Sequence, residues 1–407
     1  MTEPERLLGS AGQTFLVGDS LYLRPLELGD AARAGSWRGS PFPVPAARAE
    51  DFLKQEIPKE MERRKVRFVA CRRADDAPVG AVVFEVQDWR TASVVPTADV
   101  ALGADGSRIK AEIVRLIVPW LVEERHLTAV WVELDAGEPD TLAAAGAIGM
   151  RPAARLREAI WRNGARHDQV VYERLHAGWV ERLGDPGPGI AEATEPVLAR
   201  PRRAAPATRD GPVPANAIAI GERVYLRPLE TEDVAAVARA SREESETFFD
   251  NGRGMRSPLH LGQAVAKMGE HEPPDEIEMA VVLRDGGELI GDVGLYGIDW
   301  VHRTAETGSY LYRSAHRGAG FGSEAKHLLL AYAFDRLGLH MVRSFVWGPN
   351  TRSAAALRKQ GYRDAGRLRW SSHRGGGFAD EFVFDLLADE WRAGRGTGAG
   401  ESSPLSS

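Results

Sequence analysis

Six consecutive residues combine features that could bind an anionic group: Arg317-Gly318-Ala319-Gly320-Phe321-Gly322. Glycine at alternate positions lets a backbone reach dihedral angles closed to other residues and approach a ligand closely. If a helix begins here, its first N–H groups point at the ligand, and Arg317 adds a positive charge. The pattern predicts a phosphate-binding turn. A flexible connection is the alternative, because the residues match neither a P-loop nor a dinucleotide fingerprint.

The flanking residues predict the elements that would hold this turn. Before it, residues 309–313 alternate and carry aromatic side chains, which is typical of a half-buried strand. After it, residues 323–334 predict a helix. Its apolar stripe at helical spacing comprises Ala325, Leu328, Leu329, Tyr332 and Ala333.

The composition bounds the class of protein. A chain of 407 residues exceeds one ordinary core, so two domains are expected. The net charge of -6 argues against a nucleic-acid partner. The single cysteine, Cys71, excludes an intrachain disulfide, and no metal site is expected. Because no apolar run approaches the ~20 residues of a membrane span and no signal-peptide core begins the chain, we expect a cytoplasmic protein without a membrane partner.

A repeated pattern divides the chain. The run 21–26, followed by Asp30, recurs 203 residues later as the run 224–229, followed by Asp233. Three further matches keep the same order at offsets of 211 or 212: Pro78-Val79-Gly80 and Asp88-Trp89 with Leu289-Ile290-Gly291 and Asp299-Trp300, Ile148-Gly149-Met150 with Gln360-Gly361-Tyr362, and Trp179 with Trp391. A repeat at the distance of one domain length indicates duplication.

The repeat and the composition predict five segments. Residues 1–12 form a flexible tail, 13–183 the first domain and 184–215 a linker rich in Pro, Gly and Ala. Residues 216–395 form the second domain, and 396–407 a disordered tail rich in Gly and Ser.

Within the second copy, strands and helices are expected to mix. The predicted order is a strand at 224–229, helices from 232 and near 259–270, a hairpin of 278–283 and 289–296, the central strand, turn and helix, a strand at 340–347, a helix at 351–359, and a closing hairpin of 368–372 and 381–386. This order predicts an α/β (α+β) fold with a mixed, mostly antiparallel sheet flanked by helices.

This order of parts resembles the GNAT superfamily of acyl-CoA-dependent N-acyltransferases over nearly all of 219–392. The motifs that carry the resemblance are Ala305-Glu306 before the central strand, the glycine turn, Ala333-Phe334, Leu339-His340, Asn350-Thr351-Arg352-Ser353, Gly361-Tyr362 and Glu390-Trp391. The branch that acetylates ribosomal-protein N-termini is the closest match. The resemblance implies two tandem GNAT folds, each with a twisted sheet and a splayed central strand. It also implies transfer of an acetyl group from acetyl-CoA to a primary amine in a ternary complex.

By resemblance, acetyl-CoA contacts two parts of the second copy. Its pyrophosphate would lie on the backbone N–H groups of Gly318, Ala319, Gly320, Phe321 and Gly322, with Arg317 as counter-charge. Its pantetheine arm would bond to the central strand at Leu311, Tyr312 and Arg313, where an N–H near Leu311 polarises the thioester carbonyl. Asn350 matches a residue that contacts pantetheine; a turn residue after Gly348-Pro349 is the alternative.

The reaction needs a base for the attacking amine and an acid for the departing thiolate. Glu306 is the predicted base, directly or through water, with a surface carboxylate as the alternative. Asp299 is a second candidate, weakened because the first copy keeps the same residue as Asp88.

The acid is harder to assign. Many members of the family carry a tyrosine seven residues after the asparagine, but that position here is Leu357. Ser353 matches a serine near the sulfur, where it would stabilise the thiolate by hydrogen bonding. Tyr362 is the other candidate hydroxyl, with a core aromatic as the alternative.

The first copy lacks the predicted anion site. Its counterparts, 212 positions earlier, are Asp105 for Arg317, Gly106 for Gly318, Arg108 for Gly320, Lys110 for Gly322, Glu138 for Asn350 and Thr141 for Ser353. Asp105 would repel a pyrophosphate by roughly a kcal/mol in a partly desolvated site. Because the following apolar stripe is kept, we expect a degenerate GNAT-like domain. A rearranged basic site at Arg108 and Lys110 is the alternative.

Several functional questions stay open. The first domain could pack against the second, shape the acceptor site or mediate dimerisation. A non-catalytic acyl-CoA sensor or scaffold, and an enzyme using a longer acyl-CoA, are alternatives to the acetyltransferase. The acidic loop 246–251 would suit a cationic acceptor, such as a protein N-terminus, a polyamine, an aminoglycoside or a small metabolite; an exposed loop without this role is the alternative.

Overall fold

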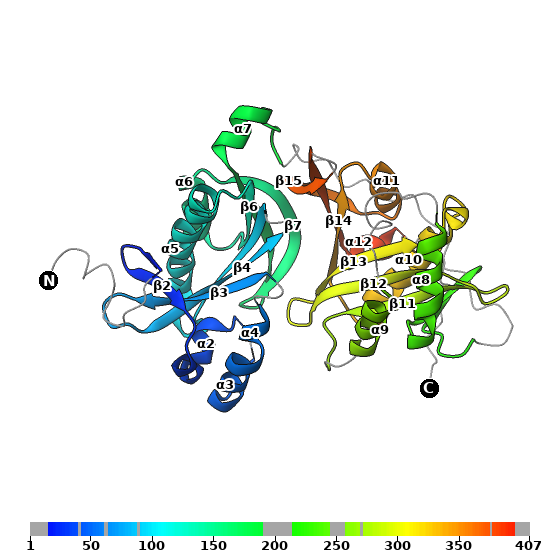
Figure 1. Cartoon of the computed structure of the whole chain (residues 1–407), viewed down its shortest axis with the longest axis horizontal. Helices are drawn as coiled ribbons and strands as arrows, with labels where there is room; N and C mark the ends of the chain where they lie inside the picture. The colour runs from blue at the N-terminus through cyan, green and yellow to red at the C-terminus, as the bar shows by residue number, and fades with distance from the viewer. Residues whose placement is uncertain are drawn as a thin grey trace, which may run out of the picture. The chain divides into compact units, whose positions relative to one another are not determined.

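The chain forms two compact units, seen in a computed structural model (Figure 1). The structure describes residues 15–39, 42–60, 64–87, 90–189, 214–244, 257–268, 272–374 and 377–394. Unit 1 comprises Met1–Ala193 with Ala365–Phe382, and unit 2 comprises Thr194–Asp364 with Val383–Ser407. The acidic loop 246–251 and Asp88 lie outside the described residues. The domain boundaries expected from the sequence stay predictions.

Unit 1 contains one mixed sheet and its covering helices. Its strands are β1 (Leu16–Val17), β2 (Leu21–Pro25), β3 (Lys65–Arg72), β4 (Pro78–Gln87), β5 (Thr91–Ala98), β6 (Ala129–Asp135), β7 (Arg151–Arg162) and β8 (Ala165–Leu175). Its helical segments are η1 (Leu28–Arg33), α2 (Ala34–Trp37), α3 (Ala46–Gln55), α4 (Ile57–Glu60), η2 (Val100–Asp105), α5 (Gly106–Pro119), η3 (Trp120–Glu124), α6 (Pro139–Ala147) and α7 (Ala177–Leu183).

Unit 2 repeats this order of parts. Its strands are β9 (Ala219–Ile220), β10 (Val224–Pro228), β11 (Ile277–Leu283), β12 (Leu289–Asp299), β13 (Thr304–Leu311) and β14 (Met341–Trp347). Its helical segments are η4 (Thr231–Asp233), α8 (Val234–Glu243), α9 (Pro258–Lys267), η6 (Ser314–His316), α10 (Phe321–Ala331), η7 (Tyr332–Arg336), α11 (Thr351–Lys359) and α12 (Ala388–Ala393). Strands β15 (Arg363–Arg374) and β16 (Gly377–Leu387) supply residues to both units.

Each sheet contains a parallel strand pair near its centre. The strand order is β1-β2-β3-β4-β5-β6-β8-β7-β15 in unit 1 and β16-β14-β13-β12-β11-β10-β9 in unit 2. The parallel neighbours are β5 with β6 and β13 with β14. A mixed sheet flanked by helices confirms the predicted α/β (α+β) class.

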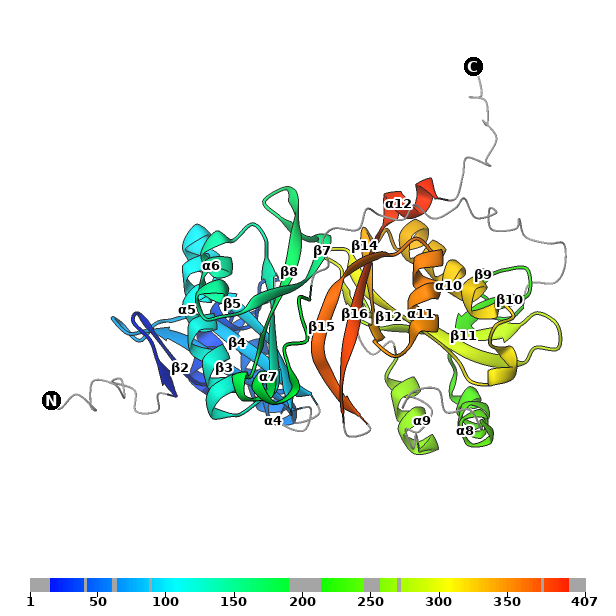
Figure 2. The same ribbon diagram turned by 90° about the horizontal axis from the view of Figure 1, so that it is seen from above.

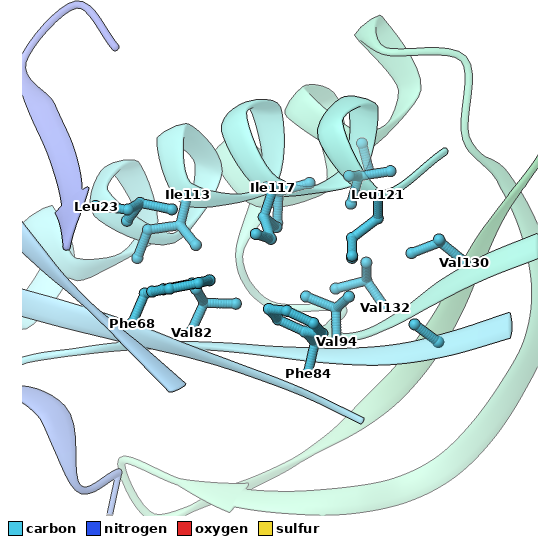
Figure 3. Packing of buried hydrophobic residues seen from close by; sticks show 14 of the residues in the cluster. Leu23, Phe68, Val82, Phe84, Val94, Ile113, Ile117, Leu121, Val130 and Val132 are labelled. Carbon is cyan, nitrogen blue, oxygen red and sulfur yellow. The ribbon is translucent and has the colours of Figure 1, made fainter. Parts of the chain in front are cut away.

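Alternating side chains place a core on each face of the unit 1 sheet. Leu21, Leu23 and Phe68 pack with α5 residues, among them Ile113 and Ile117, as Figure 3 shows for part of the cluster. The residues between them, including Tyr22 and Val69, pack instead with Trp37 and Leu53 of α2 and α3. Strand periodicity of two therefore explains why helices cover both faces.

Unit 2 has the same layering. Figure 2 shows α8 and α9 on one side of β11 and β12, and α10 on the other. A small cluster of Val237, Ala240 and Tyr312 packs α8 onto the sheet. The glycine turn lies immediately before α10, so it belongs to the face opposite α8 and α9.

The recurring segment folds alike in both units. Arg24 pairs with Asp30 at 2.7 Å, and Arg227 pairs with Asp233 at 2.6 Å. Each aspartate also completes a capping box at the start of the following helical turn. The sequence repeat therefore corresponds to the same ion pair and the same chain reversal.

Candidate active site

The central strands of unit 2 separate partway along their length. Strands β13 and β14 pair over three residue pairs only, ending at Glu306 with Arg343, although both strands continue. Beyond Glu306, β13 stays paired with β12 on its other side, to Gly291 opposite Leu311. The sheet is therefore splayed, as predicted, and the opening begins earlier than the expected region around Leu311.

The splay exposes one edge of β13. The Tyr312 N–H donates to the Ile290 carbonyl on β12 at 3.0 Å. Because successive peptide groups of a strand point to opposite sides, the N–H groups of Ser309 and Leu311 face away from β12, toward the opening. The backbone near Leu311 thus has the orientation expected of an oxyanion donor.

Tyr312 and Arg313, the other predicted pantetheine contacts, have side chains engaged elsewhere. The Tyr312 ring is buried in the α8 cluster, and burial together with Asp292 raises the pKa of its phenol. The Arg313 guanidinium bonds Glu243 at 2.7 Å and lies 3.8 Å from Glu288. Any contact of these two residues with a ligand on the open edge would therefore be made by their backbone.

The glycine turn has the backbone that its sequence requires. Gly318 and Gly320 have φ angles of +81° and +88°, a region that side chains disfavour. Gly320 is also the N-cap of α10. A side-chain atom added at Gly318 would meet nothing within 4 Å, and one at Gly322 would only touch Leu311 at 3.5 Å. The turn at this helix N-terminus therefore has room for a ligand.

Arg317 is mostly buried, and its side chain contacts the end of β13. Its side chain is only 10% exposed, and its Nη2 donates to the Leu311 carbonyl at 3.0 Å. The carboxylate of Glu244 lies 3.7 Å away. The guanidinium therefore ties the turn to the end of β13, and it places a positive charge close to the turn.

Arg223 is the second cation at the turn, and the sequence interpretation missed it. Its side chain is 44% exposed, and its Nη1 donates to the Ala319 carbonyl at 2.8 Å. The guanidinium stacks 4.7 Å from the Phe321 ring centroid and bonds Glu324 at 3.0 Å. A signal was available, because the repeat keeps the glutamate (Glu112) while the arginine becomes Ser20.

Asn350 and Ser353 lie together at the start of α11. The Asn350 side-chain oxygen accepts the Ser353 backbone N–H at 3.1 Å, which makes Asn350 the N-cap. Ser353 is half-buried on the first turn of this helix. The structure therefore gives Asn350 a local structural role and leaves its ligand role a prediction.

Glu306 is a strand residue, which corrects its expected position before the central strand. It is the third residue of β13, opposite Tyr296 on β12 and Arg343 on β14. It is half-buried at the last pair before the splay. Asp299, the second base candidate, accepts the N–H groups of Val301 and His302 at 2.9 and 2.7 Å, so it caps the β12–β13 turn.

Tyr362 belongs to a buried polar cluster beside the splay, together with Thr307, Ser344 and Lys326. Its hydroxyl lies 2.8 Å from the Thr307 hydroxyl, and burial raises its pKa. The Ser344 hydroxyl donates to the Thr307 carbonyl at 3.0 Å. Lys326 of α10 is 2% exposed, and burial lowers its pKa to about 7, while Glu306 raises it. The sequence interpretation missed Thr307, Ser344 and Lys326.

In unit 1 the equivalent residues bond to each other. Lys110 and Glu138, the counterparts of Gly322 and Asn350, form an ion pair at 2.6 Å. Arg162 adds a second bond to Glu138 at 2.8 Å, and Glu138 is buried. Arg108 lies 3.4 Å from Asp105. The basic residues considered for a rearranged anion site are therefore partnered by carboxylates.

Two features are absent from the described part of the chain. Within it, no group of three or more His, Cys, Asp or Glu side chains could hold a metal ion. No helix of the same residues is long and apolar enough to cross a membrane.

Comparison with known proteins connects this site to a family. A profile of the acetyltransferase (GNAT) domain matches residues 223–363, within unit 2. A Bacillus subtilis protein named "Probable N-acetyltransferase YjcK" is 30% identical over 174 residues, which cover 41% of this chain and 95% of the relative. The chain is thus an acyltransferase. It belongs to the GNAT N-acetyltransferase family.

Two further relatives carry a named acceptor. Spermidine N(1)-acetyltransferase of Escherichia coli is 28% identical over 145 residues, covering 36% of this chain and 75% of that protein. The spermidine N-acetyltransferase of Vibrio cholerae, solved with CoA and spermine, is 22% identical and covers 42% of this chain and 98% of its own, with a TM-score of 0.36.

Proposed function

We propose that unit 2 transfers the acetyl group of acetyl-CoA to a primary amine by direct attack in a ternary complex. The observation that carries the proposal is the splay of β13 from β14 beside a glycine turn at the N-terminus of α10. An extended thioester arm could bond to the open edge of β13 while its diphosphate rests on the turn.

The turn supplies the contacts that a diphosphate needs. The backbone N–H groups of 318–322 lie at the N-terminus of α10, where anions are stabilised. Arg223 contributes an exposed guanidinium, and Arg317 contributes a mostly buried one. Asn350 and Ser353 on α11 complete the proposed binding residues.

The chemistry then follows from the groups at the splay. The amine nitrogen attacks the thioester carbonyl carbon, and its proton passes to Glu306 directly or through water. The N–H of Leu311 stabilises the developing oxyanion. The carbon–sulfur bond breaks as the amide forms, and Ser353 stabilises the departing thiolate by hydrogen bonding. Tyr362 is buried and is not proposed as the acid for the thiolate.

Unit 1 is proposed to be a degenerate tandem copy without an acetyl-CoA site. It shares the order of elements with unit 2. It also shares the splay, because β5 and β6 pair over four residue pairs and both strands extend beyond the last pair. The Lys110–Glu138 pair joins the two positions that correspond to the turn and to the Asn350 cap. A diphosphate would have to break this partly buried pair, which costs free energy.

The acceptor is proposed to be a cationic small-molecule amine, with polyamines as the first class to test. Three carboxylates lie on the same face of adjacent strands: Glu278, Asp292 and Glu306. Asp292, Gly294 and Tyr296 alternate along β12 and therefore share a face. Glu278 on β11 pairs with Gly294, and Glu306 on β13 pairs with Tyr296, so both belong to that face. A polyamine places two or more charges in a row, which suits such an arrangement. The named acceptor of the Escherichia coli relative agrees with this class.

The test is acetyl-CoA turnover by the full chain, followed as free thiol, over a panel of amines. The panel contains spermidine, spermine, an aminoglycoside and a peptide with a free N-terminal alanine. We expect thiol release with a polyamine. Preference for the peptide would instead support the ribosomal-protein branch. Tight acetyl-CoA binding without turnover on any amine would overturn the enzymatic proposal in favour of a sensor.

A further inference from the structure

The two units differ in where their central strands part. In unit 1 the ladder of β5 and β6 extends to a fourth pair, Val94 with Val132. In unit 2 the ladder of β13 and β14 stops after three pairs. The residues at the fourth position of unit 2 are Thr307 and Ser344, so the splay opens one residue earlier there.

The side chains of this fourth position bond to the backbone where the ladder ends. The Thr307 hydroxyl lies 3.3 Å from the Arg343 carbonyl, and the Ser344 hydroxyl donates to the Thr307 carbonyl at 3.0 Å. The Tyr362 hydroxyl completes the set at 2.8 Å from Thr307. Side-chain hydrogen bonds therefore satisfy carbonyls that lie at the end of the backbone ladder, which a buried carbonyl requires.

Lys326 places a buried amine near the ring of Tyr362. The Lys326 Nζ lies 6.0 Å from the centroid of that ring. A buried amine costs free energy compared with an aliphatic side chain, whether it is charged or neutralised by a shifted pKa. Burial does lower the pKa of Lys326 to about 7. Stability alone therefore does not explain a lysine at this place.

Unit 1 carries apolar residues at all four positions. Val94 and Val132 replace Thr307 and Ser344, Val114 replaces Lys326, and Met150 replaces Tyr362. All four belong to the hydrophobic core of unit 1, where Figure 3 labels Val94 and Val132. The unit with the apolar set has the longer ladder, and it is the unit in which the glycine turn is lost.

We propose that Thr307, Ser344, Tyr362 and Lys326 of unit 2 are positioning residues that set where β13 and β14 part and so hold open the edge that receives the acyl-CoA thioester. They act through the backbone of β13, so we assign them no contact with the reacting atoms. The inference rests on the proposed function of unit 2. It predicts that the apolar set of unit 1 transplanted into unit 2 extends the β13–β14 ladder by one residue pair and so narrows the open edge.

The first test is the double substitution Thr307→Val with Ser344→Val in the full chain. We expect acetyl-CoA to bind at least tenfold more weakly, measured by titration at a temperature at which the variant is fully folded. Thr307→Ser keeps the hydroxyl and should bind within twofold of the wild type. Thr141→Val, which removes a buried hydroxyl from unit 1, is the matched control and should leave binding unchanged.

The second test is Lys326→Met, an apolar side chain of similar length. We expect kcat to fall at least tenfold while the Tm rises, a combination that a purely structural residue would not show. Unchanged acetyl-CoA affinity in the double variant together with unchanged kcat in Lys326→Met would overturn the inference. Loss of binding only in step with loss of Tm would also overturn it. If the wild type itself fails to bind acetyl-CoA, the proposed function fails, which is a separate outcome.

Discussion

Two guanidinium groups reach the glycine turn from different directions, and the sequence pointed to only one of them. Arg317 adjoins the glycines in sequence, but its guanidinium is mostly buried, with a side chain only 10% exposed. Arg223 is 94 residues away in the chain, counted from 317 and 223, and reaches the turn because β10 packs beside α10. Proximity in sequence identified the motif, whereas the fold brings the exposed cation to it from the start of another strand.

Arg223→Ser tests the exposed cation by installing the residue that unit 1 carries as Ser20. We expect acetyl-CoA affinity to fall about fivefold to tenfold, more strongly at low salt, because a charge–charge contact is screened by ions. Isothermal titration at two salt concentrations measures this. Arg358→Ser is the matched control, since Arg358 is equally exposed at 44% and ion-paired with Asp364. Equal affinities in the two variants would exclude Arg223 from the site.

The buried amine of Lys326 makes a prediction about pH and stability. Its pKa is lowered from 10.5 to about 7 in the folded protein. Between these values the unfolded chain binds more protons, so the stability of the wild type rises with pH. The cost of the buried amine, roughly 3–5 kcal/mol, is therefore fully present below pH 7 and relieved toward pH 10.

Lys326→Met lacks this cost at every pH. Its advantage in free energy of unfolding over the wild type should be largest near pH 6.5 and should shrink by pH 9.5, as denaturant titrations at both values would show. Lys59→Met removes an exposed ammonium from unit 1 and should differ from the wild type by less than about 0.5 kcal/mol. A constant advantage across this range would contradict a lowered pKa for Lys326.

At the scale of elements, α11 and β14 were predicted closely and the central strand was not. The predicted helix at 351–359 coincides with α11, and the predicted strand at 340–347 differs from β14 by one residue. The central strand was expected at 309–313, but β13 covers Thr304–Leu311. Its first half has polar and small residues, which give a weak strand signal.

Gly308 shows why that signal was weak. It pairs with Gly294 across β12 and β13, and a side-chain atom added to either glycine would lie 2.7 or 2.6 Å from Tyr296. The Tyr296 ring therefore lies over both glycines, next to Glu306. Only the fold explains glycine at these strand positions.

Gly308→Ala should displace the Tyr296 ring. We expect a loss of about 1–3 kcal/mol in the free energy of unfolding and a shift in the pH profile of turnover, because Tyr296 lies opposite Glu306. Gly262→Ala in α9 is the control, since it meets nothing within 4 Å and should be neutral or slightly stabilising. A fully stable Gly308→Ala variant would contradict the packing described here.

At the scale of the whole molecule, the repeat was visible in sequence, but the contribution of residues 365–382 to unit 1 was not. Unit 1 includes Ala365–Phe382, which follow almost all of unit 2 in the chain. Within unit 1, the Arg369 guanidinium bonds Glu173, and both side chains are fully buried. Pairing between segments nearly 200 residues apart leaves no local pattern, so no periodicity could have predicted it. Cutting the chain between the repeats would separate unit 1 from part of its own structure.

Glu173→Gln tests this assignment in the intact chain. Removing one partner of a buried ion pair leaves the other charge unpaired, so we expect a loss of about 3–5 kcal/mol in the stability of unit 1. Asp185→Asn breaks the exposed pair with Arg151 and should cost less than about 1 kcal/mol. Denaturant unfolding of both variants provides the comparison. Equal small losses would show that residues 365–382 are not anchored through Glu173.

Only one of the two similar units is proposed to bind acetyl-CoA, and titration of the full chain with acetyl-CoA measures this asymmetry directly. We predict one binding site per chain. Gly322→Lys with Asn350→Glu, which transplants the Lys110–Glu138 pair into unit 2, should abolish binding, whereas Lys110→Gly with Glu138→Asn should leave the site in unit 2 intact. Two sites per chain in the wild type, or binding that survives the transplanted pair, would contradict the account.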